Sequence, residues 1–173
     1  MKKQFILTLG LVALAMTNVS CDLDSESNHT PDIIPFIPYV INDTDTLKFT
    51  YDKDYDLFLD TICMGDTVQF AFQFGGYYNN ITRIEVDCEE AYGRIINLPA
   101  DTLNQVFDAN LSDYDDGEYV MSGEYVSVIL PFQYYPTQVG DKGEIEIYVE
   151  SDADFDANKR VLEFSIPVIA AKE

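Results

Sequence analysis

The stretch Val68-Gln69-Phe70-Ala71-Phe72-Gln73-Phe74 decides the fold class of this chain. Large apolar residues alternate with glutamine and alanine, which is the two-residue period of a β-strand with one buried face. Residues 75–80 contain glycine and asparagine and interrupt the pattern, and Ile81–Cys88 resumes it with Ile84 and Val86 on one face. We therefore predict an antiparallel β-hairpin over residues 68–88.

Shorter strand-like runs lie on both sides of this hairpin, and each is bounded by turn residues. They are Thr46–Tyr51, Asp56–Ile62, Glu124–Phe132, Gly143–Glu150 and Arg160–Val168. The one predicted helix is Pro99–Phe107, with Asp101 as its expected N-terminal cap. Many short strands without alternating long helices predict an all-β chain. We expect an antiparallel β-sandwich of the immunoglobulin-like (Ig-like) type, with a small β-barrel as the alternative.

Three prolines, Pro31, Pro35 and Pro38, punctuate the apolar segment Ile33–Ile41. Proline cannot donate a ladder hydrogen bond, so this segment is not expected in a central strand. It is also too apolar for a purely solvated linker, which leaves two placements open: along the surface of the domain, or as an edge strand. We divide the chain into a tether over residues 21–44 and a β-sandwich domain over residues 45–173.

The first 20 residues have the organisation of a secretory signal peptide. Lys2 and Lys3 precede an apolar run over Phe5–Met16, and a small residue comes just before Cys21. This run is about a dozen residues long, whereas a membrane-spanning helix needs roughly 20. We expect residues 1–20 to be removed, and no later stretch of the sequence is apolar enough to span a bilayer.

The chain carries 31 acidic and 10 basic residues, which gives a formal net charge of -21 at pH 7. This charge argues against nucleic acid and anionic lipid surfaces as partners, and it favours divalent cations and basic partners. The acidity does not indicate disorder, because 47% of the residues are hydrophobic and can form a core.

Few features of the sequence suit enzymatic chemistry. The single histidine, His29, lies in a polar segment, which argues against a Ser/His/Asp triad or a zinc site. The sequence has no glycine-rich phosphate loop, CxxC pair or HExxH motif. Carboxylate-only catalysis cannot be judged by counting, because 31 acidic residues always include some pair at a suitable distance. We predict a protein that is not an enzyme and has no organic cofactor.

The best candidate metal site is the segment with Asp152, Asp154, Asp156 and Asn158. Ca²⁺ prefers six to eight oxygen ligands, and alternating acids on a tight loop can supply several of them. Glu163 falls at the spacing of the last ligand in the calcium-loop pattern, but alanine replaces the glycine of that pattern. A Ca²⁺ site and a solvated hairpin turn both stay open.

Two pairs of tyrosines, Tyr77-Tyr78 and Tyr134-Tyr135, are candidate ligand-binding residues because both pairs lie next to turn residues. Sugar-binding surfaces stack aromatic rings on pyranose planes, and tyrosine can serve where tryptophan is absent. Neighbouring residues of a strand face opposite ways, so one member of each pair can instead belong to the core.

Cys63 and Cys88 are the two cysteines of the expected domain. An even pair in an oxidising compartment indicates a disulfide, which would stabilise the fold by about 3 kcal/mol. The predicted hairpin places Thr67 opposite Cys88 and so brings Cys63 near it. Two buried thiols that never meet are the alternative.

The segment around Cys21 resembles a bacterial lipobox, in which the cysteine after the cleavage site receives lipid. Asp22, Asp24 and Glu26 follow that cysteine directly. The resemblance implies a diacylglycerol and often a third acyl chain, such as palmitate, on Cys21, and two or more chains hold firmly to a bilayer. Early acidic residues of this kind resemble an export signal to the surface of the bacterial outer membrane. A periplasm-facing anchor is the alternative.

Four Asp-Thr-apolar tripeptides contain Thr46, Thr61, Thr67 and Thr102. They resemble the O-glycosylation sequon of secreted Bacteroidetes proteins, and ordinary turn-to-strand chemistry is the alternative reading. With the lipobox and the acidic, strand-rich body, these tripeptides make the chain resemble a small Bacteroidetes surface lipoprotein. The resemblance implies binding and not catalysis.

Two hypotheses of function follow. The first is a lipid-anchored cell-surface binding module for a glycan or a host or matrix protein, and it predicts tyrosine rings exposed together on one face. The second is a structural or accessory subunit that packs against a partner outer-membrane lipoprotein or transporter. It predicts an exposed apolar patch around Ile33–Ile41.

Overall fold

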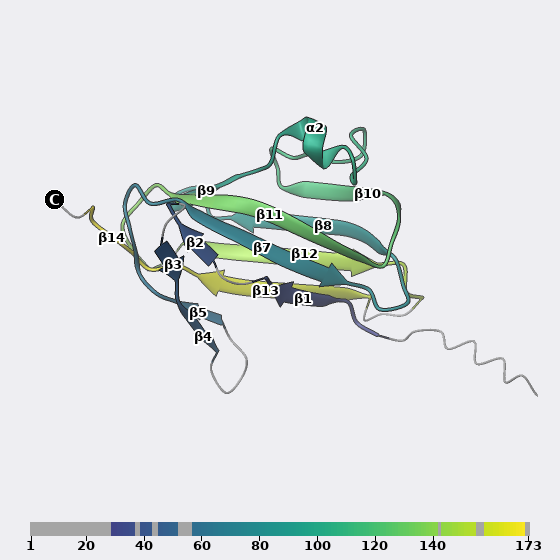
Figure 1. Cartoon of the computed structure of the whole chain (residues 1–173), viewed down its shortest axis with the longest axis horizontal. Helices are drawn as coiled ribbons and strands as arrows, with labels where there is room; N and C mark the ends of the chain where they lie inside the picture. Colours follow the sequence, from purple (N-terminus) through teal and green to yellow (C-terminus); the bar gives the residue numbers. More distant parts are fainter. Residues whose placement is uncertain are drawn as a thin grey trace, which may run out of the picture.

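The computed structural model describes residues 29–36, 39–42, 45–51, 57–141, 143–154 and 158–171. In these residues the chain forms an antiparallel β-sandwich, in which two sheets pack face to face (Figure 1). The all-β prediction is therefore confirmed. The sheets do not close on each other, so the alternative of a small β-barrel is excluded.

The first sheet has six strands among the described residues. They are β1 (Asp32–Pro35), β2 (Tyr39–Ile41), β3 (Asp45–Leu47), β7 (Val68–Gly75), β9 (Gly93–Ile96) and β11 (Ser127–Pro136). Their order across the sheet is β3-β2-β7-β11-β9, and β1 also pairs with β7. The central position of β7 matches the strength of its alternating pattern in the sequence.

The second sheet has the order β10-β8-β12-β13. Its strands are β8 (Ile81–Cys88), β10 (Glu118–Tyr125), β12 (Glu144–Ser151) and β13 (Lys159–Ser165). Three smaller elements complete the secondary structure of the described residues. They are the projecting hairpin β4 (Phe49–Tyr51) and β5 (Leu57–Leu59), the parallel pair β6 (Ile62–Cys63) and β14 (Val168–Ile169), and the short helix α2 (Ala100–Leu103) (Figure 1).

The predicted hairpin over residues 68–88 is wrong, although both of its strands exist. β7 and β8 lie in opposite sheets, and the segment between them crosses from one sheet to the other. Alternation reports which side of a strand is buried and says nothing about which strand lies beside it. The result is β1, β7 and β11 in one sheet and β8, β12 and β13 in the other. This arrangement matches strands A, B, E and C, F, G of Ig-like sandwiches.

Other boundaries differ from the prediction as well. The predicted strands Asp56–Ile62 and Arg160–Val168 each divide in two, into β5 and β6 and into β13 and β14. The run Glu124–Phe132 contains the point where the chain changes sheets, since β10 ends at Tyr125 and β11 begins at Ser127. The run Thr46–Tyr51 divides into β3 and β4. Helix α2 is shorter than predicted, and Pro99 occupies its N-cap position in place of Asp101, without a side-chain cap hydrogen bond.

The proline-punctuated segment adds an edge to the first sheet, which is one of the two placements that the sequence left open. β1 pairs with the second half of β7, and β2 pairs with its first two residues. Between them, the N–H of Phe36 donates a hydrogen bond to the carbonyl of Ala71 at 2.8 Å. An edge strand tolerates Pro35, because one of its sides needs no ladder hydrogen bonds.

Aromatic side chains fill the space between the sheets. Phe70 and Phe72 of β7 are at most 2% exposed, and both rings contact Phe132 of β11 and Phe164 of β13. The Phe72 and Phe132 rings are stacked with their centroids 5.9 Å apart. Buried rings dominate core energetics, so this cluster holds the two sheets together.

Candidate functional site

The structure does not bring the four candidate tyrosines together. Tyr77 and Tyr78 lie on the β7–β8 connection and are 51% and 77% exposed. Tyr134 pairs with Val68 at the other end of β7, and an eight-residue strand spans roughly 23 Å. The expected cluster of exposed rings on one face is therefore absent from these four positions.

Tyr134 is a core residue and not an exposed one. Its ring is completely buried, and its hydroxyl donates a hydrogen bond to the carbonyl of Tyr92 at 3.2 Å. Burial raises the pKa of Tyr134 to about 12. Tyr135 faces the other side of the sheet, where the guanidinium of Arg94 lies 5.0 Å from the centre of its ring.

The expected disulfide is also absent, since Cys63 and Cys88 are free thiols. The expectation came from the even pair of cysteines, and a predicted hairpin that placed Thr67 opposite Cys88 supported it. The crossing of the chain between β7 and β8 removes that support. Both thiols are half-buried. Burial, with the carboxylate of Asp87 as a second cause, raises the pKa of Cys88 to about 11.

The acidic segment after β12 contributes to the fold through Asp152. Its carboxylate accepts hydrogen bonds from the backbone N–H of Asn80 at 2.7 Å and from Nδ2 of Asn80 at 2.9 Å. Asp152 therefore ties the β12–β13 connection to the β7–β8 connection. Asn158 donates a hydrogen bond to the carbonyl of Ser151 at 3.3 Å, which closes the base of the β12–β13 loop.

The other expected calcium ligands are dispersed or lie outside the described residues. Asp154 is exposed, Asp156 is one of the residues outside the described set, and Glu163 lies on β13 opposite Glu146 of β12. Within the described part of the chain, no group of three or more His, Cys, Asp or Glu side chains is arranged to hold a metal ion. Calcium binding stays a prediction from the sequence.

Three of the four candidate O-glycosylation sites are exposed: Thr46, Thr61 and Thr102. Thr67 is half-buried, and its N–H donates a hydrogen bond to Oδ1 of Asn42 at 2.8 Å. Cys21 lies outside the described residues. Among the residues that are described, no helix is long and apolar enough to cross a bilayer.

The outer side of the first sheet is free of charge in its three middle rows. Cross-strand partners share one side of a sheet, so the register places Ile34, Gln73 and Ile129 in one row. The next row has Ala71 and Pro131 with Phe36 beside them. The third row runs from β3 through β2, β7 and β11 to β9. We call these residues the uncharged face: Ile34, Phe36, Val40, Thr46, Gln69, Ala71, Gln73, Ile96, Ile129, Pro131 and Gln133.

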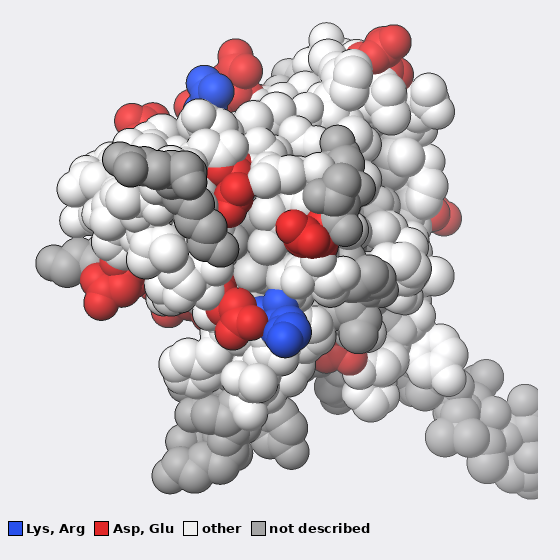
Figure 2. All heavy atoms as spheres, turned by 60° about the vertical axis from the view of Figure 1, so that its left-hand side comes forward, with Lys and Arg blue, Asp and Glu red and all other residues white. Residues whose placement is uncertain are grey.

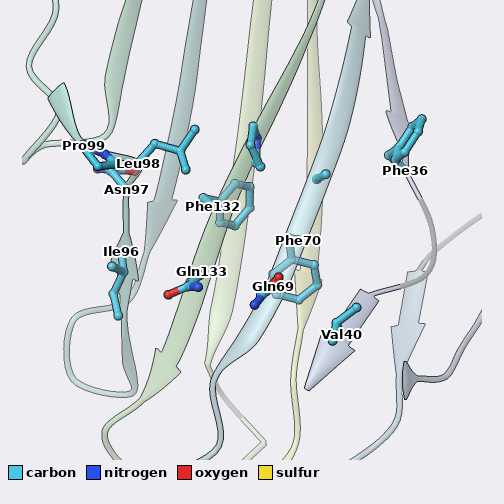
Figure 3. A pocket seen from close by; sticks show the side chains of 12 residues that line it. Phe36, Val40, Gln69, Phe70, Ile96, Asn97, Leu98, Pro99, Phe132 and Gln133 are labelled. Atoms are coloured by element: carbon cyan, nitrogen blue, oxygen red, sulfur yellow. The ribbon is translucent and has the colours of Figure 1, made fainter. Parts of the chain in front are cut away.

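A groove of about 520 Å³ crosses the uncharged face. Figure 3 shows Phe36 and Val40 on one of its sides and Ile96, Leu98 and Pro99 on the other. β7 and β11 form the floor, where small or flat residues alternate with the amides of two glutamines. A cavity of this size with mostly apolar walls and a few amides is suited to binding an uncharged group.

The outer side of the second sheet has the opposite character. Asp87, Glu146 and Glu163 are direct cross-strand neighbours, so three carboxylates form one row. Desolvation and the surrounding carboxylates, Glu163 first among them, raise the pKa of Glu146. Acidic side chains also clearly outnumber basic ones on the end of the molecule seen in Figure 2. The uncharged face is therefore an exception on an acidic molecule.

A network of side chains joins the start of β1 to the sandwich. The Tyr77 hydroxyl donates a hydrogen bond to Asp32, and Nη1 of Arg160 lies 2.6 Å from the same carboxylate. The His29 ring contacts the ring of Tyr77, with 4.9 Å between centroids. Tyr77 has a φ of 59°, a conformation uncommon outside glycine, and its hydroxyl bond to Asp32 helps to hold it there. We call these four residues the junction.

Sequence reasoning missed the uncharged face, although a signal for it was present. The outward positions of 69–73 and 129–133 are Gln, Ala, Ile and Pro, whereas those of 144–150 are Glu and Tyr. The fold prediction rests on the buried residues of each alternating strand, whereas this contrast lies in the outward-facing residues.

Comparison with known proteins adds no family to this description. No protein-family model matches the chain, and a search of curated proteins finds no match to it.

Proposed function

We propose that this protein is a non-catalytic, membrane-tethered binding module that docks another protein through its uncharged face. One observation carries the proposal: a face without a single charged residue on a chain with a net charge of -21. Depletion of charge in the centre of a patch is the compositional feature that distinguishes the cores of protein interfaces.

The exposure of this face supports the same conclusion. Ile34, Phe36 and Ile129 are 46%, 54% and 49% exposed, and they lie in adjacent rows. Single exposed apolar residues are ordinary, but a contiguous set marks an interaction site. Ile34 and Phe36 also belong to the segment Ile33–Ile41, in which the accessory-subunit hypothesis predicts an exposed apolar patch.

A protein fits this face better than a glycan does. Glycan recognition by stacking needs exposed aromatic rings, and Phe36 is the one aromatic residue of the uncharged face. Tyr134 is buried, and Tyr135 is already covered by Arg94. Apart from Phe36, the walls of the groove are mainly aliphatic side chains and proline, which pack against other apolar side chains.

The proposal includes the lipid anchor on Cys21 and a location at the surface of the bacterial outer membrane. The described chain enters the sandwich at Asp32, beside the β7–β8 connection. With an anchor at Cys21, that end faces the membrane, and the uncharged face looks sideways along the membrane. A neighbouring membrane-associated protein can meet a face in that orientation without lifting the domain away from the bilayer.

Site-specific photocross-linking tests the proposal. A photoreactive side chain replaces Ile129 on the uncharged face or, as the matched control, Val161 on the acidic side; these residues are 49% and 47% exposed. The full chain is expressed in its native host, irradiated and purified, and the adducts are identified by mass spectrometry. We expect one defined protein adduct from position 129, none from position 161, and loss of the adduct when Phe36→Glu is added.

Three outcomes contradict protein docking. Equal adducts from both positions indicate non-specific contact, and no adduct from position 129 leaves the face without a partner. An adduct that resists protease and shifts after glycosidase treatment assigns the face to a glycan.

A further inference from the structure

One edge of the first sheet is unpaired over the first part of β11. On one side β11 pairs with β7 along Ser127–Tyr134, but on the other side β9 pairs only with Gln133–Pro136. β9 ends at Ile96, and the chain then moves away from β11 (Figure 3). Among the described residues, no other strand pairs with Ser127–Pro131 on this side.

The direction of each backbone group on β11 follows from two hydrogen bonds. The carbonyl of Val126 accepts from Gly76, at the end of β7, at 2.9 Å, and the N–H of Thr137 donates to Tyr92, at the start of β9, at 2.8 Å. Backbone groups alternate along a strand, so odd-numbered residues point toward the β9 side. Ser127 and Ile129 therefore direct an N–H and a C=O each toward the open edge.

The position of proline fits this assignment. Pro131 is the next odd-numbered residue, and it has no N–H to leave unpaired. The open edge therefore presents two donors and three acceptors over five residues, with the sequence Ser-Val-Ile-Leu-Pro. These residues carry no charge and have high β-propensity in the middle.

Other long edges of the sandwich are protected against strand addition. The edge of β10 is hydrogen-bonded to the loop that precedes it: the N–H of Asp108 donates to the carbonyl of Val120, and the N–H of Ser122 donates to the carbonyl of Val106. The edge strand β13 carries Lys159 and charged neighbours. Natural sheets use cover or charge to prevent unwanted pairing. The edge at Ser127–Leu130 carries no charged residue, and no backbone hydrogen bond from another described segment covers its β9 side.

We infer that the partner adds an extended, uncharged segment as a new strand along the open edge of β11 at Ser127–Pro131. This inference rests on the proposed function, because it specifies how the docked protein contacts the sheet beside the uncharged face. An added backbone satisfies the donors and acceptors of Ser127 and Ile129, which a docked side chain cannot do. The outward side chains of the added strand would extend the row of the sheet that contains Ile129. A charged side chain in that row would have no oppositely charged partner, so the added segment is expected to be uncharged.

Two substitutions at one position separate backbone addition from side-chain contact. Ser127→Pro removes the N–H that points to the open edge, at the first residue of the strand, where proline is tolerated. Ser127→Ala keeps the N–H and controls for loss of the hydroxyl, which accepts a hydrogen bond from Gln73. Thermal unfolding of both variants checks that the fold is retained.

The probe is a library of random twelve-residue peptides displayed on phage and panned against the purified chain. We expect enriched peptides of low charge whose affinity falls at least about tenfold with Ser127→Pro and less than about twofold with Ser127→Ala. Hydrogen exchange followed by NMR should show new protection at the amides of Ser127 and Ile129 when the peptide is bound.

The inference and the proposed function can fail separately. If photocross-linking from position 129 captures a protein and Ser127→Pro does not reduce that capture, docking stands and strand addition is overturned. Enriched peptides that protect other amides, or no enriched peptide at all, also overturn strand addition. If the chain with native Ser127 gives neither a protein adduct from position 129 nor an enriched peptide, both the inference and the proposed function are overturned.

Discussion

Asp32 and Arg160 are 128 residues apart in the sequence and form an ion pair, with 2.6 Å between Oδ1 and Nη1. The pair joins the first residue of β1 to β13, which lies in the other sheet. Tyr77 donates a hydrogen bond to the same carboxylate. Three distant segments therefore meet where the described chain enters the sandwich, and β1 carries Ile34 of the uncharged face.

We expect Asp32→Asn to destabilise the protein by about 1 kcal/mol, because it weakens two charge-assisted contacts of partly exposed groups. Hydrogen exchange of the β1 amides should accelerate more than that of β12, since β1 is an edge strand that the junction holds in place. Glu124→Gln, which removes an exposed acid on β10, is the control. Equal acceleration throughout the sandwich would contradict a local role for the junction.

Glu146→Gln should stabilise the protein by about 0.5 kcal/mol at pH 7, because it removes a carboxylate flanked by Asp87 and Glu163. The folded state raises the pKa of Glu146, so the folded protein binds more protons than the unfolded chain near that pKa. Glu146 therefore contributes to the free energy of unfolding at lower pH, where it is protonated. That contribution is lost as the pH rises through the pKa of Glu146 in the folded state. The advantage of the variant in urea unfolding should therefore shrink on acidification and disappear once Glu146 is protonated.

Gly93→Ala should destabilise the fold by about 2 kcal/mol through overpacking. A Cβ at this position would lie 2.2 Å from the ring of Tyr134, which is buried and has no room to move. Gly75→Ala on β7 is the matched control, because a Cβ there has no neighbour within 4 Å. Similar midpoints of urea unfolding for the two variants would show that Tyr134 does not pack as described.

Cys88 should react slowly with iodoacetamide at pH 8. Its pKa of about 11 leaves a thiolate fraction of roughly one in a thousand at that pH, and the rate should rise tenfold per pH unit up to the pKa. Peptide mapping without reduction should also recover Cys63 and Cys88 as separate thiols. A peptide linked through both cysteines would contradict the free state of the two thiols.

O-glycosylation, if the source organism modifies this chain, should follow exposure. We expect glycans at Thr46, Thr61 and Thr102 and none at Thr67, because Thr67 is half-buried and its backbone is bonded to Asn42. Intact mass of the protein from its native host, compared with single Thr→Ala variants, measures this. A mass loss specific to Thr67→Ala would show that exposure does not control modification.

Residues 68–74 show how far local pattern reaches in this chain. Their alternation correctly predicted a strand with buried phenylalanines, because burial of one side of a strand is recorded in its own sequence. The same pattern did not identify β1, β2 and β11 as the partners of β7. The error then propagated, since the predicted β7–β8 hairpin had been used to support the disulfide between Cys63 and Cys88.

The tyrosines also show that local sequence does not determine tertiary contacts. Tyr134 and Tyr135 look alike in the sequence, yet one is buried between Gly93 and Gly143 and the other lies under Arg94. Whether each tyrosine is buried depends on which side of the sheet residue 134 faces and on which strand pairs with β11 at that position. Neither is recorded within a few residues of the pair.

By itself the sequence determined the all-β class, the positions of most strands, the buried half of each alternation and the large negative charge. Only the tertiary structure decided which strands are neighbours, and with them the free cysteines, the junction at Asp32, the uncharged face and the open edge of β11. The physical reason is that burial acts on each residue locally. Strand pairing depends on contacts between segments far apart in the chain, and alternation alone does not distinguish among the available neighbours.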